Sequence, residues 1–532
     1  MAEPTDGRLR WLAALGLVAG ETTLADLMQR LDDTPVTIVL GETATTLPAQ
    51  TTTLTAVNLL ARLFRRLVLV VPPEARIAPG LPFLDSGALL GPALRAFAHR
   101  VCRRVSVELR PEAAAGAVLH IGDATGAPGP QQVWCVGQGW RARVARRPAD
   151  LVPVADGNPV GPLLAAALGV AELFKVVFAD VLTRVIPADD VEFSALTYQV
   201  GAGAVDEPPL RAVGWLDTTL VGAGSIGSAL LWGLTHLRQA HGRLMVVDHD
   251  ALAPHNPDRA ILVLDDAADR GLAKATWAQD LIRPWLPDVR VEAFTGTMRD
   301  YVDTLAPNYT LPLVISAVDS IISRRDIQDT LPGRVLNAAT GPTKVEVSRH
   351  GALGAGPCLY CLYLPTVLER SPIQIAMEQT GFSQKDTAEF LLPDGRRLLT
   401  AGNVRGIERH NGLQAGRLRR FEGGRLADML RELGYSQLRL RTGDGDVLVT
   451  TAFVSALAGF LLLGELIKES NPDLASFQLA GVYEQELLGI PNAFRYPGTR
   501  DRSGYCLCHS RLRQQLYGEK YPARVVRPDA AA

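Results

Sequence analysis

The sequence predicts an α/β protein built from two Rossmann-like halves, the second of which carries an insertion and a zinc site. Three observations support this fold class. A glycine turn lies between an apolar strand and a helix in the middle of the chain, long small-residue helices with matching ends occur in both halves, and four of the six cysteines form two close pairs. A chain of 532 residues is long enough for two to four domains of about 150 residues each.

The glycine turn has the pattern G-x-G-x-x-G, with glycines at Gly222, Gly224 and Gly227. The apolar run DTTLVG before it predicts a buried strand, and the apolar residues of SIGSALLWGLTHL after it recur at helical spacing. Glycines at these positions allow a tight bend, a close approach of backbone amides to a phosphate, and close packing of the helix on the strand. The turn alone leaves open a nicotinamide cofactor, ATP, or a structural turn without a ligand.

Several polar residues follow the second strand of this unit. The strand RLMVVDHD ends at Asp248, whose carboxylate can accept hydrogen bonds from ribose hydroxyls. Asp250, Asn256 and Arg259 come shortly after it, and Lys274 lies on a predicted helix. A dehydrogenase needs only the first carboxylate, whereas an enzyme that activates a carboxylate with ATP must hold a triphosphate. The arginine and the lysine can offset phosphate charge and the asparagine can bind a phosphate or sugar oxygen, although each alone is also typical of a solvated surface group.

The segment LPLVISAVDSIISRRDI predicts a buried strand that ends near Asp319 and continues into a helix. A carboxylate at the carboxyl end of a central parallel strand lies where doubly wound sheets bind ligands, so Asp319 can hold Mg2+ against phosphates. The alternative is that Asp319 caps the following helix.

The cysteine pairs predict a metal site. GPCLYCLYLP contains Cys358 and Cys361, and SGYCLCHS contains Cys506 and Cys508. Four thiolates of this kind can close a tetrahedral structural zinc site. Because the second pair is more tightly spaced than usual, His509 is an alternative ligand.

The two halves of the chain resemble one another. Residues 159–175 read PVGPLLAAALGVAELFK and residues 452–468 read AFVSALAGFLLLGELIK, so both helices close on Glu-Leu-apolar-Lys. The preceding segments also correspond: VTIVLGETATTL with TTLVGAGSIGSAL, RLVLVVPPEA with RLMVVDHDAL, and AVLHIGDA with PLVISAVDS. The alternative is that any two parallel α/β domains show such similarities.

The first copy lacks the phosphate-binding pattern. Its glycine triad is reduced to Gly41, which is followed by Glu42, and Pro72 and Pro73 take the place of the ribose carboxylate. A negative charge in the phosphate turn would repel a nucleotide. The first half is therefore predicted to be an inactive structural partner of the second.

The series GAGSIG, DHDALAPHNPDR, Lys274, AVDSIISRR and GPCLYC resembles the ThiF/MoeB superfamily, which includes the ubiquitin-activating enzymes. The resemblance implies that Asp248 contacts ribose, that Asn256, Arg259 and Lys274 contact the phosphates, and that Asp319 binds magnesium. The nucleotide-binding residues expected on this basis are Gly222, Gly224, Gly227, Asp248, Asp250, Asn256, Arg259 and Lys274, the catalytic residues are Arg259, Lys274 and Asp319, and the zinc ligands are Cys358, Cys361, Cys506 and Cys508.

The resemblance also implies a fusion of an inactive and an active ThiF-type adenylation domain, a pseudo-dimer. The expected segments are a degenerate domain at 1–200, the nucleotide-binding part of the active domain at 201–361, a crossover insertion at 362–449, and the end of the active domain with the zinc cysteines at 450–532. Arg8 or Arg10 is the candidate for an arginine supplied by the partner domain. The short segment after the cysteines leaves no room for the ubiquitin-fold domain of eukaryotic relatives, which favours a compact bacterial enzyme, by analogy one of a defence-linked conjugation operon.

We therefore predict an ATP-dependent activating enzyme that adenylates the C-terminal carboxylate of a ubiquitin-like protein, with ATP, Mg2+ and Zn2+ as cofactors and a ubiquitin-conjugating-type enzyme as a further partner. The alternatives are an NAD-dependent dehydrogenase and a non-catalytic scaffold. A net charge of -2 gives no basic excess for nucleic acid. The apolar stretch 450–470 contains Glu465 and predicts a buried helix rather than a membrane span, and the cysteine usage favours the cytoplasm.

Enzymes that pass a ubiquitin-like protein onward as a thioester need a nucleophilic cysteine near the crossover region. Between Cys361 and Cys506 the sequence has no cysteine, and Cys102 and Cys135 lie in apolar runs of the first half. Three explanations stay open: the adenylate is handed directly to another protein, a zinc-pair cysteine doubles as the nucleophile, or a substitution has removed the thiol.

The chain is expected to form the adenylate without forming a reducible thioester to itself. Incubation with ATP, Mg2+ and the ubiquitin-like partner, followed by electrophoresis with and without a reducing agent, measures this directly. A partner-sized shift that disappears on reduction would contradict the expectation, because it would reveal a nucleophilic cysteine.

Overall fold

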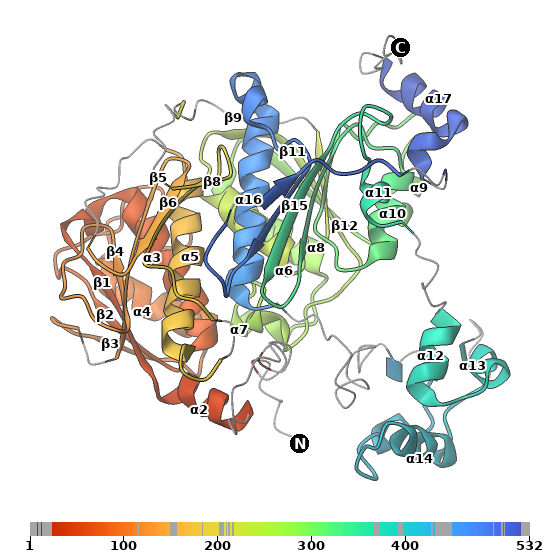
Figure 1. Ribbon diagram of the computed structural model, residues 1–532, viewed down its shortest axis with the longest axis horizontal. Coiled ribbons are helices and arrows are strands. Elements are labelled where there is room, and N and C mark those ends of the chain that lie inside the picture. The colour runs from red at the N-terminus through yellow and green to blue at the C-terminus, as the bar shows by residue number, and fades with distance from the viewer. Residues whose placement is uncertain are drawn as a thin grey trace. The chain divides into compact units, whose positions relative to one another are not determined.

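The chain forms two compact units, one of Met1–Tyr363 with Thr450–Ala532 and one of Leu364–Val449. The computed structural model (Figure 1) describes Arg8, Leu12 and residues 24–113, 116–148, 157–182, 185–201, 207–208, 210, 213–214, 217–364, 372–391, 397–426, 429–430, 450–492, 494–501, 504 and 506–522. Arg10 and residues 431–449 of the predicted insertion lie outside the described residues.

The larger unit contains two sheets with the same strand order. The first sheet has the order β3-β2-β1-β4-β5-β6-β7-β8 and the second has the order β12-β11-β10-β13-β14-β15-β16-β17, with β9 paired to β11. The strands of the first sheet are β1 (Pro35–Leu40), β2 (Arg66–Val70), β3 (Ser106–Leu109), β4 (Ala117–Ile121), β5 (Gln132–Gln138), β6 (Arg141–Ala145), β7 (Asp190–Ser194) and β8 (Gln199–Val200). Those of the second are β9 (Val213–Gly214), β10 (Thr218–Val221), β11 (Ala240–Asp248), β12 (Val289–Thr295), β13 (Leu313–Ser316), β14 (Val335–Thr340), β15 (Lys344–His350), β16 (Val482–Glu486) and β17 (Phe494–Tyr496).

The matched strand orders confirm the predicted pair of Rossmann-like halves. In each sheet the first five strands of the order run parallel and the remaining strands are antiparallel. The pairs β1 and β10, β2 and β11, and β4 and β13 occupy the same places in the two orders. These are the three pairs of segments whose sequences resemble one another.

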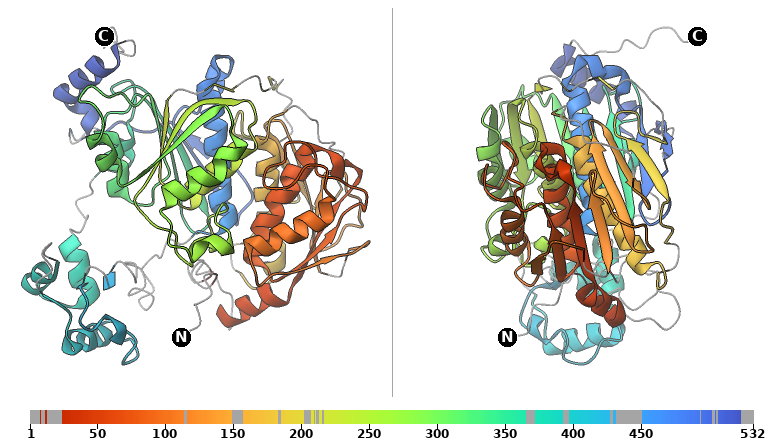
Figure 2. Two further views of the ribbon diagram at one scale, coloured as in Figure 1. Left: turned by 180° about the vertical axis from the view of Figure 1, so that it is seen from behind. Right: turned by 90° about the vertical axis from the view of Figure 1, so that its left-hand side faces the viewer.

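Helices cover the two sheets unequally. The helices of the larger unit are α2 (Leu24–Asp33), α3 (Leu47–Leu63), α4 (Leu90–Val101), α5 (Val160–Phe178), α6 (Ser225–Thr235), α7 (Asp265–Ala268), α8 (Lys274–Ile282), α9 (Met298–Asp303), α10 (Ile321–Asp329), α11 (Leu359–Leu362), α16 (Ala452–Ser470) and α17 (Arg511–Lys520). Seen from behind, α3 and α4 lie over one face of the first sheet (Figure 2). In the described part of the chain, α9 and α10 of the second half have no helical counterparts between β3 and β5.

The two longest helices, α5 and α16, lie side by side between the sheets (Figure 1). Both are apolar on nearly every side, which is typical of helices buried all round. Among the described residues, α5 is the one helix long and apolar enough to cross a membrane, and it is buried along its whole length inside the protein.

Each of these helices carries a buried ion pair near its end. On α16, Glu465 Oε1 lies 2.5 Å from Lys468 Nζ, and both side chains are 0% exposed. On α5, Glu172 and Lys175 form the equivalent pair. Burial is the largest cause of a lowered pKa for both lysines, and the paired glutamates oppose this effect.

The two lysines also connect the halves of the unit. Lys468 Nζ, from the second half, donates to the carbonyl oxygens of Ala195 at 3.0 Å and Leu196 at 3.2 Å in the first half. Lys175 Nζ, from the first half, donates to the carbonyl oxygen of Gly489 at 2.9 Å in the second half. The repeated Glu-Leu-apolar-Lys ends are therefore a reciprocal link between the two copies.

The smaller unit is helical in its described part. It contains α12 (Pro372–Thr380), α13 (Gln384–Leu391) and α14 (Ala401–His410). Its core is formed by apolar side chains that include Phe390, Ile407 and Leu426.

Replacing Lys468 with methionine should lower the free energy of unfolding by about 3–5 kcal/mol, because Glu465 would remain buried without its partner. Chemical denaturation of the variant measures this loss, and the double variant Glu465→Gln with Lys468→Met should recover part of it. Glu108→Gln, which breaks an exposed pair with Arg110, is the matched control and should cost no more than about 1 kcal/mol. Equal losses in Lys468→Met and this control would contradict the structural role of the buried pair.

Candidate functional site

The glycine turn joins β10 to α6, and two of its glycines are required by close packing. Gly222 has a φ of +96°, and a Cβ atom there would lie 2.6 Å from the carbonyl oxygen of Ala317. A Cβ atom at Gly227 would lie 1.9 Å from the carbonyl oxygen of Gly222. Gly224 precedes the first turn of α6, and a Cβ atom there would meet nothing within 4 Å. The turn thus brings the helix close to the strands and leaves open space at the helix N-terminus, where backbone amides attract anions.

Asp248 connects this turn to the loop after β11. Its carboxylate accepts hydrogen bonds from the backbone N–H of Ala223 at 2.6 Å and of Asp250 at 2.8 Å. Burial raises the pKa of Asp248, and these two hydrogen bonds act in the opposite direction. The side chain is thereby fixed at the carboxyl end of β11, next to the glycine turn.

Asp250 and Lys274 form an ion pair beside Asp248. Lys274 Nζ lies 2.8 Å from Asp250 Oδ2, and the backbone N–H of Lys274 donates to the carbonyl oxygen of Asp250 at 2.9 Å. Burial would raise the pKa of Asp250, but the hydrogen bond and charge of Lys274 outweigh this effect and hold the pKa below its usual range. Since Lys274 is the first residue of α8, the pair ties this helix to the end of β11.

Asn256 and Arg259 lie in the loop that follows. Asn256 begins the short helix η2 (Asn256–Asp258) and is buried. Its side-chain oxygen accepts a hydrogen bond of 2.9 Å from the backbone N–H of Ala253, so one polar atom of the predicted ligand shapes the loop itself. Arg259 directly follows η2 and is half-buried.

Asp319 lies exposed between β13 and α10. The residue that caps α10 is Ser320, whose side chain accepts hydrogen bonds from the backbone N–H of Ile322 at 3.1 Å and Ser323 at 3.4 Å. The capping alternative for Asp319 is therefore wrong. Because β10 and β13 are parallel neighbours, Asp319 and the glycine turn lie at the same edge of the sheet.

A buried arginine behind Asp319 was not identified from the sequence. Arg324, on α10, donates to the side-chain oxygen of Asn337 at 3.2 Å, and its guanidinium lies 4.9 Å from the ring centroid of Tyr363. The segment AVDSIISRR contains Arg324, but nothing in that segment indicates that this arginine is buried. Its position on the buried face of α10, one turn before Ile327, shows that it is internal. Its contacts hold α10 against β14.

The first half places a carboxylate where the second half has its open turn. Asp123, after β4, accepts hydrogen bonds from the backbone N–H of Thr43 at 3.0 Å and the Thr43 hydroxyl at 2.6 Å. A Cβ atom at Gly41 would lie 2.4 Å from Asp123 Oδ1. Glu42, which the sequence suggested as the repelling charge, is exposed. The charge that engages the first-half turn is that of Asp123.

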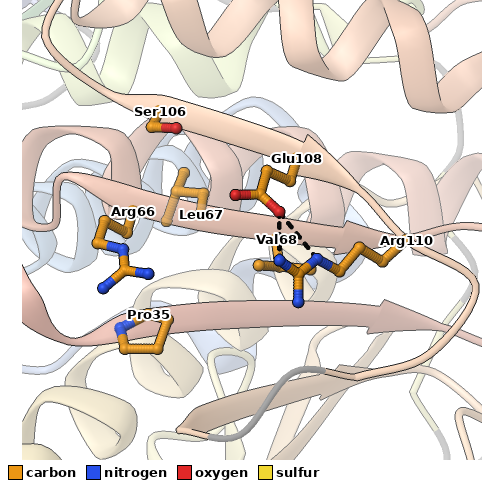
Figure 3. A pocket seen from close by; sticks show the side chains of 7 residues that line it. All are labelled: Pro35, Arg66, Leu67, Val68, Ser106, Glu108 and Arg110. Atoms are coloured by element: carbon orange, nitrogen blue, oxygen red, sulfur yellow. Dashed lines mark hydrogen bonds and ion pairs between the residues drawn. The ribbon is translucent and has the colours of Figure 1, made fainter.

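Arg8, a candidate for the arginine of the partner domain, is engaged within the first half. Its guanidinium donates to the carbonyl oxygen of Leu63 at 2.9 Å and to Asp32 at 2.7 Å, and the side chain is buried. A cavity of about 250 Å³ also belongs to the first sheet (Figure 3). Arg66 and the ion pair between Glu108 and Arg110 line it. Neither feature includes a residue of the glycine turn in the second half.

The four predicted zinc ligands come together at the end of the larger unit. The six distances between the sulfurs of Cys358, Cys361, Cys506 and Cys508 range from 3.2 to 3.9 Å. A tetrahedral zinc site with zinc–sulfur bonds of about 2.3 Å needs sulfurs about 3.8 Å apart. His509, the alternative ligand, is exposed and its ring nitrogen bonds to the carbonyl oxygen of Asp501. The residues present therefore fit a zinc site with four cysteine ligands.

Comparison with known families identifies the second half. Residues 198–477, more than half of the chain, match the model of the ThiF family. The chain belongs to the ThiF family. Residues 35–185 match the model of the BilD N-terminal domain.

Two further comparisons cover large parts of this ThiF-family protein. It is 27% identical over 525 residues to the Sinorhizobium fredii protein y4jF, with 96% of each chain covered. The crystal structure of E. coli MccB with MccA-N7isoASN matches 57% of this chain and 68% of its own chain, at 14% identity and a TM-score of 0.34. As a member of the ThiF family, this protein is an adenylating enzyme of the MoeB-like kind. Enzymes of this family use ATP and Mg2+ and act on the C-terminus of a small protein or peptide.

Elemental analysis of the purified protein should find one zinc ion per chain. Cys508→Ser should lose the metal and lower the Tm, because the binding energy of a structural zinc ion is folding energy. Cys102→Ser is the matched control, since Cys102 is a free cysteine outside the cluster, and it should retain the metal. A folded wild-type protein without zinc would contradict the assignment.

Proposed function

We propose that this protein uses ATP to adenylate the C-terminal carboxylate of a ubiquitin-like protein and releases pyrophosphate. The observation that carries the proposal is the group of polar side chains at the carboxyl edge of the second sheet. Three adjacent parallel strands, β11, β10 and β13, end at this edge. The glycine turn follows β10, buried Asp248 and the ion pair of Asp250 with Lys274 lie at the end of β11, and exposed Asp319 follows β13. Doubly wound sheets bind nucleotides at this edge.

In the proposed reaction, an oxygen of the substrate carboxylate attacks the α-phosphorus of ATP. The new bond joins that oxygen to phosphorus, while the bond from the α-phosphorus to the oxygen bridging the β-phosphate breaks and pyrophosphate leaves. Asp248 would accept hydrogen bonds from the ribose, and Lys274, Arg259 and Asn256 would bind phosphate oxygens. Asp319 would bind Mg2+, which offsets the charge that develops on the leaving pyrophosphate.

The cationic side chains support ATP over a nicotinamide cofactor. Lys274 is 12% exposed and points its ammonium group at the Asp250 carboxylate, at the end of the same strand that carries Asp248. A dehydrogenase reaction would not need the positive charges of this lysine and of Arg259 or an exposed carboxylate after β13. ATP gives each of them a phosphate oxygen or a metal ion to bind.

We propose that the first half, residues 1 to about 200, is a degenerate adenylation domain that binds no nucleotide. The support is the carboxylate of Asp123, which accepts a hydrogen bond from the backbone N–H of Thr43 in the turn that corresponds to the glycine turn. A phosphate would have to displace this carboxylate and would be repelled by it.

We assign residues 201–361 and 450–532 to the active domain and 362–449 to the crossover insertion. We further propose that the protein belongs to a bacterial conjugation system that acts in antiphage defence, with a ubiquitin-conjugating-type enzyme as a partner.

Asp319→Asn and Lys274→Met should each lower the rate of pyrophosphate exchange into ATP by about 10²- to 10³-fold. Asp319→Asn weakens the binding of the Mg2+ that offsets charge on the leaving pyrophosphate, and Lys274→Met removes a positive charge that does so directly. The assay contains Mg2+ and a ubiquitin-like protein as the carboxylate substrate. Asp269→Asn, which changes an exposed carboxylate at the end of α7, is the matched control and should leave the rate unchanged. Tight binding of NADH without binding of ATP would overturn the proposed function.

A further inference from the structure

One arginine of the first half reaches into the loop that carries Asn256 and Arg259. Arg62, on α3, is buried, and its guanidinium donates to the carbonyl oxygens of Ile261 at 2.7 Å and Val263 at 3.0 Å. It also donates to the carbonyl oxygen of Pro257. All three acceptors belong to the second half of the larger unit and follow Asn256 within eight residues.

The helix α3 presents this arginine together with a second polar side chain. Asn58, one turn earlier, accepts a hydrogen bond of 2.9 Å from Arg62 Nε and donates to the carbonyl oxygen of Ile261 at 3.1 Å. Both side chains are buried. Together they bind backbone oxygens of the segment between β11 and α8. This segment contains no strand, only loop, η2 and the four-residue α7, so no neighbouring strand pairs with these oxygens.

The geometry requires a guanidinium group. Arg62 engages three of its nitrogens with four acceptors that lie in different directions, and a lysine offers only three donors on one atom. Burial lowers the pKa of Arg62 to about 10, so the side chain stays charged at neutral pH. A buried charge of this kind is tolerated only when its donors are satisfied, which the loop carbonyls achieve.

The loop held by Arg62 is also fixed from its other end. The backbone N–H of Ala260 donates to the carbonyl oxygen of Asn256 at 3.0 Å, and the side chain of Asn256 bonds to Ala253. Arg259 therefore lies between two anchored points, Asn256 on one side and Ile261 on the other. A shift of the Arg62 anchor would move the phosphate-binding side chains proposed above.

We infer that Arg62 is a positioning residue, through which the first half holds the loop of Asn256 and Arg259 in place for ATP. The inference rests on the proposed function for its link to ATP, while the contacts between Arg62 and the loop stand independently of it. The first half would thereby contribute to the nucleotide site of the second half without touching the nucleotide. Arg62 would act through the backbone of residues 257–263.

The test compares Arg62→Met with Arg95→Met, a matched control on α4 of the same half whose arginine is exposed. Hydrogen exchange followed by mass spectrometry should show at least about tenfold faster exchange of residues 253–264 in Arg62→Met, because buried carbonyl oxygens lose their donors. Calorimetric titration with ATP and Mg2+ should show about tenfold weaker binding, equal to about 1.4 kcal/mol. Arg95→Met should match the wild type in both measurements.

Two further variants keep the test decisive. Arg62→Lys should recover part of the protection and part of the affinity, and Asn58→Ala, which keeps Arg62, should show a smaller effect in the same residues even where Arg62→Met fails to fold. Unchanged exchange in residues 253–264 in folded Arg62→Met, or faster exchange spread evenly over the whole unit, would overturn the inference. Failure of the wild type to bind ATP would instead overturn the proposed function, and the exchange measurement would still decide whether Arg62 holds the loop.

Discussion

The fold of the larger unit depends on two buried helices, α5 and α16, that each contain a glutamate and a lysine in an apolar environment. A buried lysine must be both paired and fully hydrogen-bonded, because an unpaired charge in the interior is costly. Lys175 and Lys468 meet this requirement by binding carbonyl oxygens of the opposite half. The two sheets are therefore joined by lysine-to-carbonyl hydrogen bonds that neither half can form alone. The second sheet, whose carboxyl edge carries the candidate site, is held in place by these bonds.

The two halves differ most at the corresponding turns after β1 and β10. In the first half, Asp123 binds the backbone N–H of Thr43, so the turn already holds an anion. In the second half, Asp319 is exposed and the glycine turn opens at the N-terminus of α6. The turn of the first half thus already holds the carboxylate that follows β4, whereas the turn of the second half leaves its helix N-terminus open to an external anion.

Much of the fold and part of the site were predictable from the sequence because they depend on local patterns. The glycine triad, the strand that ends at Asp248, and the spacing of the paired cysteines are each readable within a few residues. The repeated helix ends revealed the duplication, since both copies keep the same buried pair. Arg62, Asn58 and Asp123 were not predicted, because their partners lie on other elements far along the chain and nothing in their local sequence marks them. Asp319 was correctly placed after a strand, but Ser320 takes the capping role that the sequence also allowed for it.

The sequence by itself determined the family, the two-copy architecture and the residue types available for nucleotide and metal binding, because these depend on strand and helix periodicity and on short motifs. Only the tertiary structure decided which charges neutralise one another. Lys274 pairs with Asp250, Asp123 binds the turn of its own half, and Arg62 crosses to the loop of the other half. The physical reason is that a charge acts over a few ångströms in space, and the distances between these groups are set by the packing of the two sheets against α5 and α16 rather than by separation along the chain.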